Sequence, residues 1–213
     1  MKVTFFGATG KTGQALIDEG LKRHLDITVF ARTGSPFDHP GVRVVRGSLT
    51  DPEALRTALR GSDAVVSALG PTKIPHPGGL PITTATQALM AVMQQEGVRR
   101  LVAVSTGTAL DPADTFDWKI RLPAQLIRFA MPSAYRDILG LAQAIRGSAL
   151  DWTMVRVALL TDDPAVARLQ VGPYGRTQHA LRISRKDVAA FMLDQLSDTR
   201  FLRAAPGISA HRA

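Results

Sequence analysis

Cysteine is missing from the 213 residues of this sequence. Its absence excludes disulfide bonds, thiolate nucleophiles and cysteine-based zinc sites together. Five histidines are present, and none of them stand at the short spacings that a metal site needs. We therefore expect no bound metal.

Long apolar runs are missing as well, because no stretch approaches the roughly 20 residues of a membrane span. Met1 leads directly into a predicted strand, so we expect no signal peptide. These two features predict a cytoplasmic protein without a membrane partner.

Aromatic residues are few, with two tryptophans and two tyrosines, while the formal net charge is +8. A basic balance can indicate nucleic-acid binding. Here the basic residues are scattered in short runs, such as the pair Arg99-Arg100, and too few aromatic rings are present to stack bases. We expect no nucleic-acid partner, and interpret the charge as a solvated surface that also attracts an anionic cofactor.

Apolar residues make up 45% of the chain and charged residues 21%, which is typical of a globular protein. The length predicts one domain over residues 1–213. In the first half, short apolar strands alternate with helical segments. We expect strands over residues 3–6, 27–31, 42–45, 63–68 and 99–104, and helices over residues 12–23, from 51 onward and over 83–96.

This alternation predicts an α/β fold, with a single doubly wound parallel sheet of the Rossmann type and helices on both faces. Asp51 and Pro52 have the residue types of an N-cap and a first helical position. The stretch from Gly70 to Pro81 is rich in proline and glycine, so we expect an irregular loop at a strand end, where ligands bind in such folds.

The second half is less regular. We expect helices over residues 117–129 and 133–146, a strand over 151–157, and a helix over 184–196 with Ser184 as its N-cap. Asp187 is interpreted as a capping carboxylate with a structural role. Trp118 and Trp152 are interpreted as core residues.

The segment from Gly7 to Gly13 reads Gly-Ala-Thr-Gly-Lys-Thr-Gly, and it follows a strand and opens a helix. That context is the one that a dinucleotide-binding fingerprint requires. The first glycine permits a tight turn, the second lets the backbone approach a pyrophosphate, and the third allows close packing of helix on strand. The turn therefore predicts a bound dinucleotide.

Gly10-Lys11-Thr12 also looks like the end of a nucleoside-triphosphatase phosphate loop. That motif needs a glycine five residues before Gly10, where this chain has Phe5 inside an apolar strand. A plain glycine turn is the remaining alternative. We favour the dinucleotide.

Arg32 stands at the end of the second predicted strand, about 20 residues past the glycines, where an Asp or Glu usually holds the ribose of NAD. A guanidinium there suits a 2′-phosphate, which a carboxylate would repel. Lys11 can add a second positive charge. These residues predict NADP(H), unless Arg32 is merely exposed.

Six further segments of the chain are informative when they are taken together with the glycine turn. They are residues 45–51, 65–70, 104–106, 150–156, 160–162 and 183–189. Together with the turn they resemble the atypical short-chain dehydrogenase/reductase group, specifically its small NAD(P)H-binding members that are similar to biliverdin reductase B (flavin reductase) and to NmrA. Motif and resemblance together imply a set of cofactor-binding residues: Gly7, Thr9, Gly10, Lys11, Thr12, Gly13, Arg32, Ser48, Leu49, Ala68, Leu69, Gly70, Ser105 and Val157.

The chain also departs from that group. Ser48 stands where the group usually has Asp, Gln143 where it often has Glu, and Val157 where it has Pro. The Tyr-x-x-x-Lys pair of typical short-chain dehydrogenases is absent: Tyr135 is followed by Leu139, and Tyr174 by Gln178. Without that pair no tyrosine is primed as a general acid or base, which argues against an alcohol dehydrogenase.

Few residues are left for catalysis. Ser105 and Thr106 can hydrogen-bond the nicotinamide amide or a substrate oxygen, or simply satisfy backbone groups at a strand end. Tyr135 opens a helix that faces the site, or packs in the core. His76 can donate a proton, although a lone loop histidine is expected to be exposed.

The sequence thus predicts an NADPH-dependent reductase of a planar acceptor such as a flavin, quinone or tetrapyrrole, acting as a monomer or homodimer. The cofactor supplies the hydride chemistry and the protein supplies its position. The alternative is a non-catalytic NADP(H)-binding sensor of the NmrA type. Catalytic candidates are Ser105 and Tyr135.

Overall fold

The computed structural model describes residues 1–71, 75–166 and 168–211. An eight-stranded sheet runs through the molecule in the order β3-β2-β1-β4-β5-β6-β10-β8. A second sheet pairs two short parallel strands, β7 and β9. The strands are β1 (Lys2–Phe6), β2 (Asp26–Arg32), β3 (Arg43–Gly47), β4 (Ala64–Ser67), β5 (Arg100–Thr106), β6 (Asp151–Val157), β7 (Leu159–Thr161), β8 (Leu169–Gly172), β9 (Arg182–Ser184) and β10 (Gly207–Ala210).

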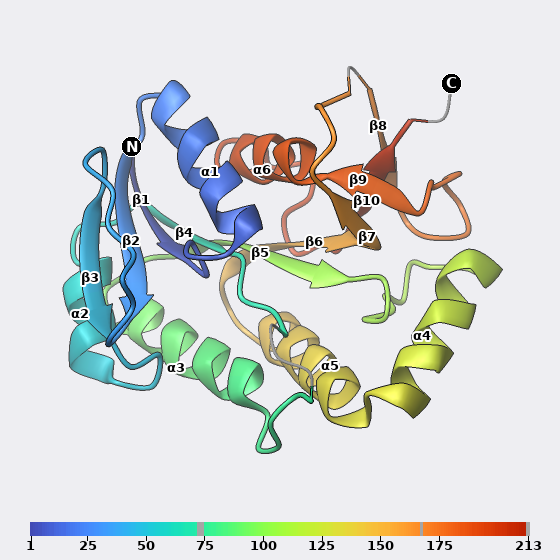
Figure 1. Cartoon of the computed structure of the whole chain (residues 1–213), viewed down its shortest axis with the longest axis horizontal. Helices are drawn as coiled ribbons and strands as arrows, with labels where there is room; N and C mark the ends of the chain where they lie inside the picture. Colours follow the sequence, from blue (N-terminus) through green and yellow to red (C-terminus); the bar gives the residue numbers. More distant parts are fainter. Residues whose placement is uncertain (72–74, 167, 212–213) are drawn as a thin grey trace.

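Helices cover both faces of the large sheet, as the sequence predicts (Figure 1). On one face lie α1 (Lys11–Lys22) and α6 (Arg185–Asp194), and on the other α2 (Pro52–Leu59), α3 (Pro81–Gln95) and α5 (Pro132–Arg146). The remaining helix, α4 (Trp118–Ala130), lies at the end of the molecule next to α5. Each face has its own apolar core, so the sheet separates two clusters of buried side chains. This is the Rossmann-like α/β fold.

The sheet is parallel from β3 to β10, but β8 pairs antiparallel with β10. The expected doubly wound parallel sheet thus has one antiparallel strand, at this edge. Parallel strands need a crossover connection, usually a helix, which returns the chain to the opposite edge. No helix stands between β6 and β8 among the described residues, so the chain enters β8 from the carboxyl edge and runs in reverse.

Two predicted helix starts are confirmed in atomic detail. The Asp51 carboxylate accepts hydrogen bonds from the backbone N–H groups of Glu53 and Ala54. The Ser184 hydroxyl accepts from the N–H of Asp187 and donates to its carboxylate, which also accepts from the N–H of Val166, so Asp187 has a structural role. Both caps satisfy donors that a helix otherwise leaves free.

One predicted core residue is wrong. Trp152 is buried in the sheet, but the Trp118 ring at the start of α4 is exposed. The predicted loop from Gly70 to Pro81 has no helix or strand before Pro81 among its described residues, and residues 72–74 lie outside them. No helix in the described parts of the chain is long and apolar enough to cross a bilayer.

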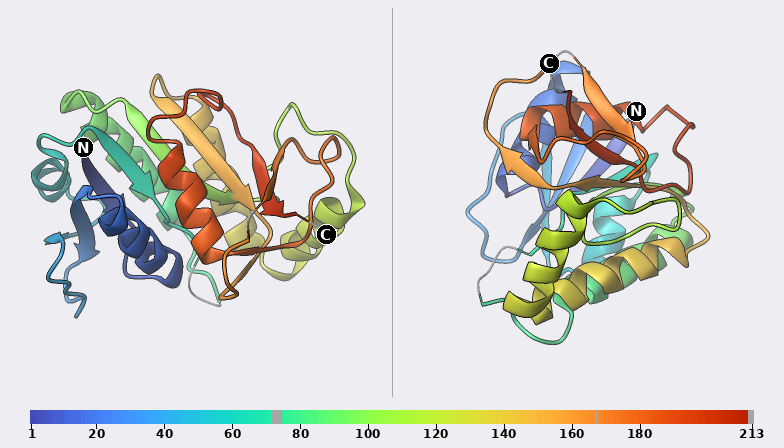
Figure 2. Two further views of the ribbon diagram at one scale, coloured as in Figure 1. Left: turned by 90° about the horizontal axis from the view of Figure 1, so that it is seen from above. Right: turned by 90° about the vertical axis from the view of Figure 1, so that its right-hand side faces the viewer.

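The chain reverses its direction of travel across the sheet between β1 and β4. It moves from β1 outward to β2 and β3, and then returns to β4, β5 and β6 on the other side of β1. The view from above in Figure 2 shows the neighbouring strands fanning across this point. Ligands in open α/β sheets bind outside the carboxyl ends of the strands at such a reversal.

Candidate dinucleotide-binding site

The glycine turn lies at the carboxyl end of β1, directly over the reversal. Gly7 has a positive φ of 73°, and a Cβ there would lie 2.6 Å from the backbone C and O of Ala68. A Cβ on Gly13 would lie 2.2 Å from the Cα of Ala8. Both positions need glycine, because the backbone beyond β4 and the turn itself occupy the space.

Gly10 is different, since packing does not require it. A Cβ on Gly10 would meet only the Gly7 carbonyl oxygen, at 3.5 Å, and its φ is an ordinary −86°. Gly10 is also the N-cap of α1, whose first turn has no side-chain cap and no acidic residue. Open space and free N–H donors at a helix start are what a pyrophosphate needs. This part of the chain fits the dinucleotide.

Lys11 does not extend toward Arg32. Its Nζ lies 2.9 Å from the Asp162 carboxylate, which also pairs with Arg185 of α6 at 2.5 Å. The Lys11 hydrogen bond is the largest of the effects that lower the pKa of Asp162. Lys11 thus joins the turn to the segment after β7, and Thr12 beside it is half-buried.

Arg32 ends β2 and is exposed, and its guanidinium makes no hydrogen bond or ion pair with the described residues. Its backbone is in register with Gly47, so Ser48 and Leu49 follow close by. The Ser48 hydroxyl bonds that of Thr50 at 2.9 Å, and Leu49 packs partly on the core. Arg32 is therefore free to receive an anion.

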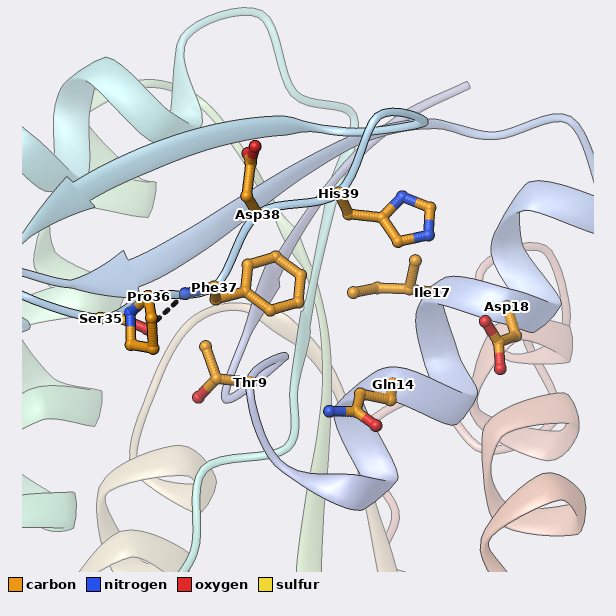
Figure 3. A pocket seen from close by; sticks show the side chains of 9 residues that line it. All are labelled: Thr9, Gln14, Ile17, Asp18, Ser35, Pro36, Phe37, Asp38 and His39. Carbon is orange, nitrogen blue, oxygen red and sulfur yellow. Dashed lines mark hydrogen bonds between the residues drawn. The ribbon is translucent and has the colours of Figure 1, made fainter.

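A cavity of about 650 Å³ lies between the turn and the loop after β2. Figure 3 shows the Phe37 ring pointing toward Thr9 and Ile17, with Gln14 across from it. The cavity includes Thr9 of the glycine turn, but its lining does not include Arg32, Ser48 or Ser105. Its lining is Thr9, Gln14, Ile17, Asp18, Ser35, Pro36, Phe37, Asp38 and His39.

The end of β4 supplies the next edge of the site. Ala68 donates its N–H to the Phe6 carbonyl at 2.8 Å, and Leu69 packs partly on the core. A Cβ on Gly70 would meet nothing within 4 Å. Ala68 and Leu69 at this strand end thus lie against the glycine turn, and the space beside Gly70 is open.

Ser105, near the carboxyl end of β5, is buried, yet its hydroxyl has no partner among the described residues. A buried polar group without a partner is costly and rare in proteins. Thr106 beside it bonds Thr108 instead. In the neighbouring strand, the Val157 side chain packs in the core under α1 and α6, and its carbonyl accepts from Gly107 at 3.0 Å.

A histidine–aspartate pair near this edge was not anticipated. The expectation that His76 is exposed is wrong: its side chain is 4% exposed, and Nε2 lies 3.4 Å from Asp137 Oδ2. Nδ1 is buried and has no partner among the described residues. Asp137 comes from α5, 61 residues away along the chain, so no local pattern could reveal the pair.

Asp137 also starts α3. Its buried carboxylate accepts from the N–H groups of Ile82 and Thr83 at 2.9 and 2.8 Å, and from the Thr83 hydroxyl at 2.7 Å. The residue at the N-cap position, Leu80, has no side chain that can cap, and its φ is +51°. Asp137 therefore fixes the start of α3 and lies beside the imidazole of His76. Tyr135, half-buried, lies in the first turn of the same α5.

Behind Ser105, a buried ion pair joins β6 to the loop that follows β5. Arg156 is in register with Ser105 and contacts both Asp114 carboxylate oxygens, at 2.5 and 2.7 Å. Burial opposes the Asp114 charge, but hydrogen bonds from Arg156 and from backbone N–H groups outweigh it and lower the pKa of Asp114. The ring of Tyr174 lies under Arg156, 4.7 Å from its guanidinium carbon.

The described residues contain no cluster of three or more acidic or histidine side chains that could hold a metal ion. A glycine turn at a strand-order reversal, a free helix start and an unpaired arginine at the end of β2 define a dinucleotide-binding α/β protein. The sequence profile described as NAD(P)H-binding matches residues 7–199. The chain belongs to this NAD(P)H-binding family, as its sequence led us to expect.

Known proteins support the same fold. The uncharacterized protein YwnB of Bacillus subtilis is 23% identical over 205 residues, which is 92% of each chain. A short-chain dehydrogenase/reductase of Veillonella parvula, solved in complex with NADP, has a TM-score of 0.76 at 22% identity, over 98% of this chain and 94% of that one. ChuY of Escherichia coli O157:H7, described as an anaerobilin reductase, has a TM-score of 0.75 at 18% identity over the whole of both chains.

Proposed function

We propose that the protein is an NADPH-dependent reductase that transfers hydride to a planar acceptor such as a flavin, quinone or tetrapyrrole. The observation that carries the proposal is the buried, unpartnered Ser105 hydroxyl at the same sheet edge as the open glycine turn. A hydroxyl at that place has no structural task among the described residues. Binding and orienting the reacting ring gives it one.

Each group of residues has its own part in holding the cofactor, which supplies the hydride when it is bound. The N–H groups at the start of α1 bind the pyrophosphate, and Arg32 pairs with the 2′-phosphate. Ser48 and Leu49 flank the adenosine, while Ala68, Leu69 and Gly70 border the middle of the site. The Ser105 hydroxyl orients the nicotinamide amide, and Val157 closes the far side.

The acceptor proton comes from a group other than a tyrosine–lysine pair. Tyr135 has Leu139 where that lysine would stand, so its phenol borders the acceptor without being primed as an acid. We assign the proton to His76, whose imidazole is held beside Asp137 with Nδ1 unpaired. Holding the acceptor ring against the cofactor supplies most of the rate, by proximity.

We propose further that residues 1–213 act as a single NAD(P)-binding domain, as a monomer or homodimer in the cytoplasm, with a small-molecule acceptor.

A second function has one observation in its favour. The cavity beside Thr9 borders the glycine turn and leaves out Ser105. A sensor that binds NADP(H) without turnover needs the glycine turn but not Ser105.

Turnover distinguishes the two functions. Purified protein is mixed with NADPH and, in separate reactions, with FMN, menadione or biliverdin, and NADPH oxidation is followed by absorbance. In parallel, NADPH binding is titrated by its fluorescence. The reductase oxidises NADPH with at least one acceptor, and Ser105→Ala slows that oxidation. Binding without oxidation by any acceptor would instead establish the sensor, and absence of binding would overturn both.

A further inference from the structure

Helix α4 turns large apolar side chains away from the protein. Within it and just before it, five such side chains are between 63% and 79% exposed: Phe116, Trp118, Leu122, Leu126 and Phe129. Only Ile120 and Ala124 of the helix are buried. Contiguous exposed apolar surface of this kind marks an interaction site.

The spacing of these residues places them on one side. At about 100° per residue, Trp118, Leu122 and Phe129 fall within a narrow sector, with Leu126 at its margin. Ile120 and Ala124 point the opposite way, into the protein. We call Trp118, Leu122, Leu126 and Phe129 the α4 stripe. The helix that carries it lies at the end of the molecule next to α5 (Figure 1).

Basic residues border the α4 stripe on both sides. Arg121 and Arg128 flank it on one side of the helix and Lys119 on the other, and the helix contains no acidic residue. Asp117, which precedes it, accepts a hydrogen bond from the Lys119 N–H as the N-cap. A cavity of about 480 Å³ beside the first turn adds Arg182 next to Trp118 and Lys119. The whole chain carries a net charge of +8.

We propose that α4 docks on the surface of an anionic lipid bilayer. An apolar face of Trp, Phe and Leu with basic margins is the pattern of helices that lie in the headgroup region. Basic side chains near such a helix gain from anionic headgroups while their stems stay along apolar surface. Docking of this kind needs no spanning helix, so it revises the expectation of no membrane partner without requiring a membrane span.

Repulsion between like charges disfavours a second copy of the chain as the partner of the α4 stripe. Two copies joined through the α4 stripe would bring Lys119, Arg121 and Arg128 of each close to their counterparts, and both molecules are strongly basic. An anionic bilayer has the opposite charge. The proposal does not depend on the reductase activity, and its test does not measure turnover.

The test is co-sedimentation of the full-length protein with large vesicles, made either of phosphatidylcholine alone or of phosphatidylcholine with phosphatidylglycerol. We expect binding to the anionic vesicles that weakens as salt is raised, and little binding to the neutral ones. Trp118 is exposed and the second tryptophan, Trp152, is buried, so vesicle binding should also shift the tryptophan emission to shorter wavelength.

Two variants and a matched control locate the contact. Trp118→Ala with Phe129→Ala should weaken partitioning by about tenfold or more. Arg121→Gln with Arg128→Gln should weaken it by roughly 10- to 30-fold. Arg43→Gln with Arg60→Gln removes the same charge from exposed positions on β3 and after α2, at the far end of the molecule, and should change it far less (Figure 1).

Three results would overturn the proposal. Wild-type protein could remain in the supernatant with anionic vesicles. The two arginine pairs could weaken binding equally, which would mean that net charge alone attracts the protein. Finally, analytical ultracentrifugation could show a dimer that Trp118→Ala with Phe129→Ala dissociates, which would make the α4 stripe a contact between copies.

Discussion

At the scale of single residues, the three glycines of the turn differ in what holds them in place. Gly7 and Gly13 are enclosed by backbone, whereas the side of Gly10 is open. Packing therefore explains two of the glycines, whereas the open side of the third, the N-cap of α1, leaves room for a ligand. The difference yields a direct test of the dinucleotide site.

Gly10→Val should abolish detectable NADPH binding, because its side chain fills the approach to the start of α1, while the fold remains. Gly13→Ala is the contrasting variant. The added Cβ meets the Ala8 backbone, so Gly13→Ala should weaken NADPH binding and also lower the melting temperature. Fluorescence titration and thermal melting measure both effects. Normal NADPH binding by Gly10→Val would refute the site.

Arg32→Ala tests the preference for NADPH. A hydrogen bond to a charged group contributes about 1.5–3 kcal/mol, so NADPH binding should weaken roughly 10- to 150-fold with little change for NADH. Arg43→Ala, at an exposed position in the neighbouring strand, controls for the loss of a basic charge. Titration of both cofactors decides the point. Equal losses for NADPH and NADH would show that Arg32 does not contact the 2′-phosphate.

His76→Gln and Tyr135→Phe separate the two candidate proton donors. Loss of a general acid typically costs 10²–10⁴-fold in rate, so His76→Gln should slow acceptor reduction by about a hundredfold or more. Tyr135→Phe should retain more than roughly a tenth of the activity. NADPH affinity, measured alongside, should be unchanged in both. The reverse ranking, with affinity unchanged, would identify Tyr135 as the acid.

At the scale of elements, the Arg156–Asp114 pair connects β6 to the loop that follows β5. Arg156→Leu leaves the Asp114 carboxylate buried without its partner, and breaking a buried pair in this way costs about 3–5 kcal/mol of unfolding free energy. Denaturant unfolding measures the loss. Arg99→Leu removes the exposed pair with Asp151 and should have a much smaller effect. Similar losses for the two would contradict a structural role for the buried pair.

Some helices and strands can be predicted from local sequence, and others cannot. The strand expected over residues 151–157 has those bounds in the structure, and all of its residues after Asp151 are buried, as fits a sheet covered on both faces. The starts of α2 and α6 follow from Asp51 and Ser184. By contrast, β8 and β10 are four residues each and contain glycines, so no periodicity distinguishes them from loop.

The site divides in the same way. The glycine turn and Arg32 could be found because each stands at a fixed distance from a strand end. His76 and Asp137 could not, since only the tertiary fold joins them. Trp118 was misassigned because an amphipathic pattern gives the period of a helix but not which face is turned inward, and in α4 the larger side chains face outward.

At the scale of the whole molecule, His179 links stability to pH. Burial lowers the pKa of His179 below its ordinary value of 6.5, although its hydrogen bond to the Gly172 carbonyl opposes the shift. The unfolded chain therefore binds this proton more readily than the folded one. The contribution of His179 is complete above about pH 6.5 and is lost as the pH falls below it.

We expect the melting temperature to fall between about pH 7 and pH 5, and to fall less in His179→Gln. His24→Asn changes an exposed histidine to a residue that tolerates its positive φ, and should leave the slope unchanged. Thermal melting across this range measures all three proteins. An equal slope in His179→Gln would mean that another group sets the pH dependence.

The contact of Gly7 with the backbone of Ala68 and Leu69 also sets an order of events during synthesis. A growing chain that ends at Gly61 already contains every residue of the glycine motif. It does not yet contain β4, nor the backbone of Ala68 and Leu69 that packs against the turn. Dinucleotide can therefore stabilise the folded protein but cannot seed its first sixty residues. A protein released early from the ribosome would carry the motif and lack the site.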